Sequence, residues 1–173
     1  LNPKLVEGGS ISNFSFSLNS QRFIYSASQE KANVSEIYSV PIGGGTATKL
    51  NVPVSEGEFV SDFWFRDGKA GNRIYYFVSK DGVNDLYSVP IAGGASSKVN
   101  DTAANFVALW STDDGKVVLY AAKTGNFSNG DAGYTLFARS LDASTSITLS
   151  TPLATEGTNT GFSHVMKVSN DGK

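Results

Sequence analysis

Carboxylate and amide side chains outside the apolar stretches are the residues best suited to chemistry, because such groups bind cations and polar ligands or act as acids and bases. Four are acidic and fall between groups of alternating apolar stretches: Glu56, Glu58, Asp101 and Glu156. A polar insertion at 126–133 adds three more: Asn126, Asn129 and Asp131. We predict that these seven residues contact a partner, with a merely tolerated insertion at 126–133 as the alternative.

Catalysis by a nucleophile or by a metal ion is not expected. The chain has no cysteine, and His164 is its only histidine, so a zinc site built from several His and Cys ligands cannot form within one chain. Ser163 lacks the Gly-x-Ser-x-Gly setting of a nucleophile, and on a strand it would point away from His164. We therefore predict no catalytic residue, no metal site and no cofactor.

Several aspartates are better explained by turns than by ligand binding. Asp67, Asp114 and Asp171 each precede a glycine, and in such turns Asp bonds its own backbone while Gly supplies positive φ. The segment 81–85 has oxygen ligands at a spacing like that of a calcium loop, but it is short and lacks the closing glutamate. We predict a plain turn there.

The elements that carry these residues are set by an internal repeat. The pentad at 38–42, Tyr-Ser-Val-Pro-Ile, recurs at 87–91, a shift of 49. Downstream, Lys-Leu-Asn at 49–51 corresponds to Lys-Val-Asn at 98–100. A third, less similar copy lies at 136–141. Self-similarity at a fixed period of this length indicates a repeat architecture.

Period-two alternation then predicts thirteen strands. They are 11–17, 22–27, 36–42, 46–51, 60–65, 73–78, 85–91, 96–99, 106–111, 117–122, 135–141, 146–149 and 163–169. Four antiparallel strands in a unit of roughly 40 to 50 residues are typical of β-propeller blades. We predict an all-β fold, a propeller segment with blades at about 11–51, 60–100 and 106–149 and a partial blade at 163–173. Five aromatic residues on first strands are expected to form inter-blade core: Phe14, Phe16, Trp64, Phe65 and Trp110.

Composition argues against two classes of partner, nucleic acids and membranes. The net charge is -2 and no long cluster of Lys and Arg occurs, so nucleic acid is not expected. The apolar runs are too short to span a bilayer, so membrane insertion is not expected. Alternation of four antiparallel strands places the loops between second and third strands at the same end as the inter-blade segments. That end is mildly acidic, and the sequence leaves open whether it binds a cation, a basic segment or nothing.

Asp-Gly-Lys at 114–116, Leu-Tyr-Ser-Val at 86–89 and Gly-Gly at 93–94 resemble the TolB-type WD-like propeller repeats. The Tyr-Ser-Val-Pro-Ile form is most similar to tandem repeats of bacterial exported or cell-surface proteins. The resemblance implies an extracytoplasmic setting, in the periplasm or at the cell surface, and a binding role. Ser-Thr-Asp-Asp-Gly at 111–115 also resembles the Asp-box of sialidase propellers, in a single copy.

Two classes of function follow. The favoured one is a non-catalytic scaffold or binding module of a larger bacterial envelope or surface protein, with a protein or glycan partner. The alternative is the propeller portion of a hydrolase, prolyl-peptidase-like or sialidase-like, whose catalytic residues lie elsewhere. Because three units and one strand do not close a ring, a larger parent is expected, with homo-association through open blade edges as second choice.

Overall fold

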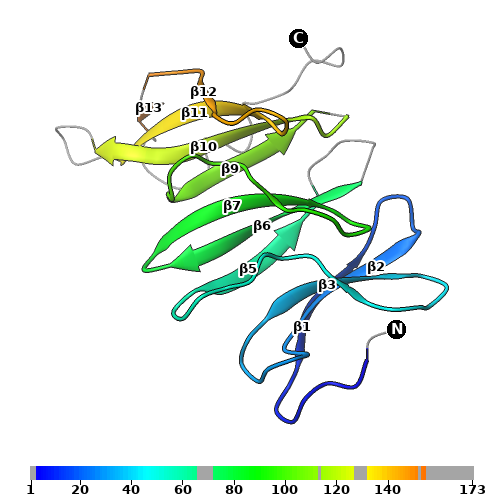
Figure 1. The fold of residues 1–173 in the computed structure, drawn as a ribbon. Coiled ribbons are helices and arrows are strands. Elements are labelled where there is room, and N and C mark those ends of the chain that lie inside the picture. Colours follow the sequence, from blue (N-terminus) through cyan, green and yellow to red (C-terminus); the bar gives the residue numbers. More distant parts are fainter. Residues whose placement is uncertain (1–2, 66–71, 113, 127–131, 152, 155–173) are drawn as a thin grey trace.

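The computed structural model describes residues 3–65, 72–112, 114–126, 132–151 and 153–154 (Figure 1). These residues form strands and turns, and none of them belongs to a helix that could cross a membrane. The strands are β1 (Ile11–Phe16), β2 (Arg22–Ala27), β3 (Glu36–Pro41), β4 (Thr48–Lys49), β5 (Phe59–Trp64), β6 (Arg73–Lys80), β7 (Val83–Pro90), β8 (Ser97–Lys98), β9 (Phe106–Ser111), β10 (Val117–Asn126), β11 (Ala132–Ser140), β12 (Ile147–Thr148) and β13 (Leu153–Ala154).

The described strands form three antiparallel sheets. Sheet 1 has the order β1-β2-β3-β4, sheet 2 the order β5-β6-β7-β8, and sheet 3 the order β9-β10-β11-β12 with β13 added beside β11. Figure 1 shows the sheets stacked in chain order, with sheet 2 between the other two. The all-β prediction is confirmed. The strand expected at 163–169 lies outside the described residues, and β13 was not predicted.

The hairpin between β6 and β7 is tighter than predicted. Asp81 and Gly82 have φ values of 51° and 80°, the left-handed pair that a two-residue hairpin turn requires. The strand β6 therefore continues to Lys80 and β7 begins at Val83, whereas the alternation predicts an end at 78 and a start at 85. The turn predicted in this segment is confirmed at Asp81 and Gly82.

The turns between first and second strands use side chains as the sequence indicated. Asp114 accepts a hydrogen bond from the backbone N–H of Lys116 at 3.0 Å. In sheet 1, where the Asp-Gly pair is missing, Asn19 accepts from the N–H of Gln21 at 3.1 Å. The two turns are thus chemically equivalent. The turns expected at Asp67 and Asp171 lie outside the described residues.

The repeated Lys-Leu-Asn triplet has a structural explanation. Lys49 pairs with Glu36 at 2.8 Å, Leu50 is buried, and Asn51 accepts the N–H of Ile37 at 2.8 Å. This arrangement satisfies a backbone donor of β3 beyond the two-residue strand β4. Sheet 2 repeats it: Lys98 pairs with Asp85 at 2.9 Å, and Asn100 accepts the N–H of Leu86 at 2.6 Å.

Most of the core lies between the sheets. We call the face of a sheet that points to the preceding sheet its leading face, and the opposite one its trailing face. The first core joins the trailing side chains Ile24, Ile37 and Leu50 of sheet 1 to the leading side chains Ile74, Tyr76 and Val78 of sheet 2. The second joins Tyr75, Leu86 and Val99 of sheet 2 to Val118, Tyr120 and Ala122 of sheet 3. Stacked apolar faces thus hold the sheets together.

Two of the aromatic residues expected in the inter-blade core are exposed instead. Phe14 is 65% exposed and Phe16 is 55% exposed. Both contact Phe23 on the leading face of sheet 1, which no described sheet covers. Phe65 does pack against the core between sheets 1 and 2, and Trp64 contacts Phe77 edge to face. Trp110 is half-buried.

Candidate functional site

The segment that connects sheet 2 to sheet 3 is held firmly against sheet 2. The backbone groups of Ala104 and Asn84 exchange two hydrogen bonds, of 2.9 and 3.0 Å. The side-chain amide of Asn100 donates to the carbonyl of Thr102 at 2.7 Å. Residues 101–105 therefore form a fixed wall beside the first residues of β9.

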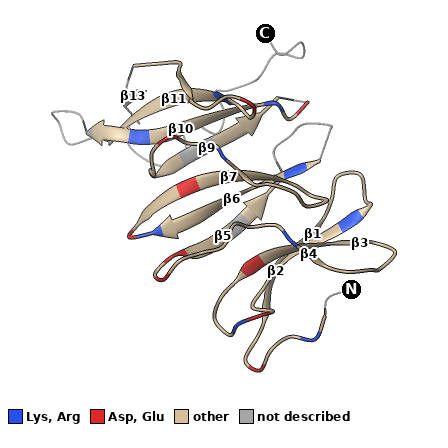
Figure 2. Ribbon diagram, in the orientation of Figure 1, with Lys and Arg blue, Asp and Glu red and all other residues tan. Residues whose placement is uncertain are grey.

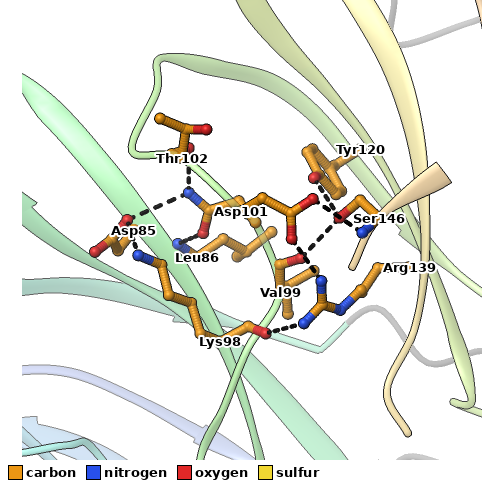
Figure 3. Close-up of polar contacts among 10 residues, drawn as sticks. Asp85, Leu86, Lys98, Val99, Asp101, Thr102, Tyr120, Arg139 and Ser146 are labelled. Carbon is orange, nitrogen blue, oxygen red and sulfur yellow. Dashed lines mark hydrogen bonds and ion pairs between the residues drawn. The ribbon is translucent and has the colours of Figure 1, made fainter. Parts of the chain in front are cut away.

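Asp101 joins this wall to sheet 3, as Figure 3 shows. One carboxylate oxygen accepts from the guanidinium of Arg139 at 2.6 Å, and the other accepts the backbone N–H of Ser146 at 2.9 Å. The hydrogen bond from Ser146, followed by the positive charge of Arg139, lowers the pKa of Asp101. Arg139 is 8% exposed, so Asp101 neutralises a buried cation at the junction of two sheets.

A tyrosine and a serine form a second link across the same junction, which we call the latch. The hydroxyl of Tyr120 donates to Ser146 Oγ at 2.8 Å, and Ser146 Oγ donates to the carbonyl of Val99 at 3.3 Å. Burial raises the pKa of Tyr120, so the phenol stays protonated as the donor. Between sheets 1 and 2 the latch recurs with Tyr76, Ser96 and the carbonyl of Leu50, at 3.0 and 2.9 Å.

Beside these links lies a cavity of about 320 Å³. Its walls come from the connecting segment and from the facing side of sheet 3: Asp101, Thr102, Ala103, Ala104, Tyr120, Ala122, Lys123, Thr124 and Phe137. The rings of Tyr120 and Phe137 stack with centroids 5.1 Å apart. Apolar walls with a few polar groups, at a volume near the lower end of the usual range, are typical of small-ligand sites.

The β10–β11 hairpin extends beyond this cavity. Its register shifts between Lys123 and Gly125, and pairing then continues to Asn126 opposite Ala132. The hydroxyls of Thr124 and Thr135 lie 2.7 Å apart across the hairpin. The insertion expected at 126–133 is thus partly strand, because both arms continue the ladder. Residues 127–131 lie outside the description.

The seven predicted contact residues do not form one described cluster. Glu56 is exposed in the segment between sheets 1 and 2. Glu58 accepts the N–H of Ser55 at 2.7 Å and so supports its own turn. Asp101 lines the cavity, and Asn126 ends β10. Asn129, Asp131 and Glu156 lie outside the described residues. The binding role of all seven stays a prediction.

Sequence reasoning missed three groups at this junction: Tyr120, Arg139 and Ser146. A signal existed for the latch, since Tyr76 and Tyr120 occupy equivalent places in the repeat. Arg139 has no counterpart in the other two sheets, where Val40 and Val89 stand, so the repeat gave no reason to single it out.

Charge is dispersed over the described part of the molecule. Figure 2 shows basic and acidic positions mixed across the three sheets. No group of three potential metal ligands occurs among the described residues. The arrangement offers an apolar cavity with a polar rim, and this favours recognition of a partner group.

One of the comparisons with known proteins, a match to a solved structure, agrees with the architecture. No protein-family model matches the chain, and no curated protein matches it. A solved structure from a study of two prolyl endopeptidases matches with a TM-score of 0.59 and 11% identity, covering 87% of this chain and 21% of that one. A protein described as TolB from Agrobacterium tumefaciens matches with a TM-score of 0.48 and 19% identity, covering 80% of this chain and 48% of that one.

This chain therefore spans about a fifth of the prolyl endopeptidase and about half of the TolB chain. The part of the prolyl endopeptidase that it matches is a β-propeller domain, and an identity of 11% is a likeness of fold alone. Three antiparallel sheets stacked face to face, with that likeness, support a propeller-type arrangement of the chain.

Proposed function

We propose that the chain is a non-catalytic β-propeller module that binds a protein or glycan partner at the junction of its second and third blades. The observation that carries the proposal is the cavity of about 320 Å³ between the connecting segment 101–105 and sheet 3. It opens at the end of the blades where the inter-blade segments meet the hairpins between second and third strands. Rigid scaffolds of this kind present loops to ligands.

The lining indicates the kind of group that fits. The aromatic rings of Tyr120 and Phe137 and the methyl groups of three alanines suit an aliphatic side chain or the apolar face of a sugar ring. Lys123 at the exposed rim can pair with a carboxylate, whereas the carboxylate of Asp101 is already engaged by Arg139 and Ser146. A ligand with an apolar anchor and a neighbouring acid is the best match.

The wider setting rests on the repeat. The Tyr-Ser-Val-Pro-Ile form at 38–42 and 87–91 is most similar to tandem repeats of bacterial exported proteins. We therefore assign the module to a larger envelope or surface protein, in an extracytoplasmic location.

A second candidate function is the propeller part of a hydrolase. The fold likeness to a prolyl endopeptidase, which covers 87% of this chain, favours it. In that case substrate cleavage would be carried out by a separate part of the protein. Hydrolysis of proline-containing peptides by the complete protein would support this candidate over the binding module.

The test of the binding module fills the cavity. Ala103 is exposed at the cavity wall, so Ala103→Trp places an indole in the cavity while leaving the sheets intact. Ala92→Trp is the matched control, since Ala92 is an exposed alanine in the turn after β7, at the other end of the blade. Arrays of immobilised peptides and glycans serve as probes. The proposal expects binding that Ala103→Trp abolishes and Ala92→Trp retains; equal binding by both variants would refute it.

A further inference from the structure

The leading face of sheet 1 is apolar, and no described sheet packs on it; Leu5 packs against its buried side chains, which include Tyr25 and Tyr38. The rings of Phe14 and Phe16 both contact Phe23, and the contacts continue through Tyr25 to Tyr38, with centroids of contacting rings 5.5 to 5.9 Å apart. Phe14 and Phe16 are the most exposed of these rings. An apolar patch of this kind marks an interaction surface.

The repeat shows what kind of surface covers such a face. Phe14 lies opposite Tyr25, Phe63 opposite Tyr76, and Leu109 opposite Tyr120 in the three sheets. At this shared position Phe63 is 5% exposed, because the trailing face of sheet 1 packs on it, whereas Phe14 is 65% exposed. The natural cover for the open face is therefore the trailing face of another such sheet.

The chain carries a matching trailing face at its other end. Leu50, Val99 and Leu149 make the same backbone hydrogen bond to the third strand of their sheets, at 2.8, 2.7 and 2.8 Å. Leu50 and Val99 are buried under the next sheet at 2% and 0% exposure, whereas Leu149 is 52% exposed. Leu119 and Leu136 beside it are half-buried.

The close contacts of the internal junction also have counterparts on the two open faces. Between sheets 1 and 2, a side chain added at Gly93 would come within 2.8 Å of Thr48. The equivalent of Gly93 in sheet 1 is Gly44, which has open space around it. The equivalent of Thr48 in sheet 3 is Ile147, which is 67% exposed.

We propose that the leading face of sheet 1 binds the trailing face of sheet 3 in a second copy of this chain. The contact is head to tail, so residues of one face meet residues of a different face. The three described sheets of two copies make six, a number within the four to eight blades of known propellers, so two copies of this chain suffice for a closed ring.

This junction differs from the internal ones in one respect. At the place of Ser96 and Ser146 sheet 1 has Ala47, and the hydroxyl of Tyr25 instead donates to Gln29 at 2.8 Å. No serine latch can form between the copies. The contact between chains is therefore weaker than the contacts within them and is expected to be reversible on dilution.

The first test is the mass in solution of the 173-residue chain, measured by sedimentation at several concentrations. We expect a concentration-dependent dimer, and the double variant Phe14→Ser/Phe16→Ser is expected to be monomeric. Both side chains are exposed, so the fold should persist. The matched control is Phe59→Ser, an equally exposed phenylalanine at the start of β5, which should still dimerise. A wild-type chain that stays monomeric would overturn the proposal.

The second test separates a head-to-tail contact from a symmetric one. Leu149→Glu disables the trailing face of sheet 3, and Phe14→Ser/Phe16→Ser disables the leading face of sheet 1. Each variant alone is therefore expected to be monomeric. A mixture of the two should form a heterodimer through the one intact junction. Dimerisation of Leu149→Glu alone, with no complementation in the mixture, would show a symmetric contact and contradict the inference.

The third test restores the missing latch. Ala47→Ser introduces the hydroxyl found at Ser96 and Ser146, which would accept from Tyr25 and donate to the carbonyl of Leu149 in the second copy. One net hydrogen bond corresponds to about fivefold tighter dimerisation. Unchanged or weaker association would contradict a junction built like the internal ones.

Discussion

The guanidinium of Arg139 in sheet 3 lies 2.6 Å from the carboxylate of Asp101 in the segment that connects sheet 2 to sheet 3. Arg139 is buried, while the side chain of Asp101 is 46% exposed. The pair is therefore unequal: loss of the acid leaves a cation in a desolvated site, whereas loss of the arginine leaves an acid that water can reach.

This asymmetry predicts the outcome of substitutions at the pair. Asp101→Ala should lower the free energy of unfolding by about 1.5–3 kcal/mol, because a hydrogen bond to a charged group is lost and Arg139 stays buried. Arg139→Met should cost less, because Met keeps apolar atoms where the arginine methylenes pack and because water can reach the carboxylate of Asp101 that is left behind. Urea denaturation measures both, with Glu56→Gln, an exposed acid of the other connecting segment, as control. Equal costs for the two substitutions at the pair would contradict the asymmetry.

The same pair predicts a response to acid. The pKa of Asp101 is lowered on folding, so the unfolded chain binds a proton more readily. Its contribution to stability is complete well above the unfolded value of about 3.9 and is lost as the pH falls below that value. Denaturation curves between neutral pH and about pH 3 should show a smaller loss of stability in Asp101→Asn than in the wild type. Parallel pH profiles would argue against this role.

The latch predicts different costs for the same substitution in two sheets. Tyr76→Phe leaves the N–H of Val52 without its acceptor at 3.0 Å and removes the donor to Ser96. We expect a loss of about 1–2 kcal/mol in the free energy of unfolding. Tyr25→Phe, the matched change in sheet 1, loses only the bond to Gln29 and should cost about 0.5 kcal/mol or less. Thermal or urea unfolding of the two variants makes the comparison.

Two glycines distinguish backbone strain from contact between sheets. Gly44 and Gly93 have φ values of 93° and 97°, so Ala at either position carries a similar backbone cost of about 1 kcal/mol. Only at Gly93 would the new methyl group meet Thr48. Gly93→Ala should be the more destabilising, and adding Thr48→Ala should remove the difference. If the two glycine variants unfold alike in urea, the close approach is unimportant.

The sequence predicted the strands and turns well because their signals are local. Alternation and the shift of 49 between Tyr38 and Tyr87 placed the three sheets, and the Asp-Gly and Asn-Ser pairs placed turns. Strand ends were less accurate: the ladder between β6 and β7 continues until Asp81 and Gly82 reverse the chain, which alternation alone does not reveal.

The candidate site was harder to predict because its groups meet only through packing of one sheet on another. Asp101 and Arg139 are 38 residues apart, and neither has a counterpart in the repeat with the same chemistry. Exposure depended on position in the stack as well: Phe14 and Phe63 are identical residues at equivalent places, and their surroundings alone make one exposed and the other buried.

The place of sheet 2 between two neighbours has a consequence for the order in which the backbone opens. Its strands β6 and β7 are covered on both sides by the two inter-sheet cores, whereas each outer sheet has one side on which no described sheet packs. Stability in stacked repeats is a sum of unit and neighbour contributions, so a unit with two neighbours opens last. In the monomeric chain, amide hydrogens of Tyr75 and Leu86 should therefore exchange with deuterium more slowly than those of Tyr25 and Leu136, and fraying should proceed from the ends of the stack toward its middle.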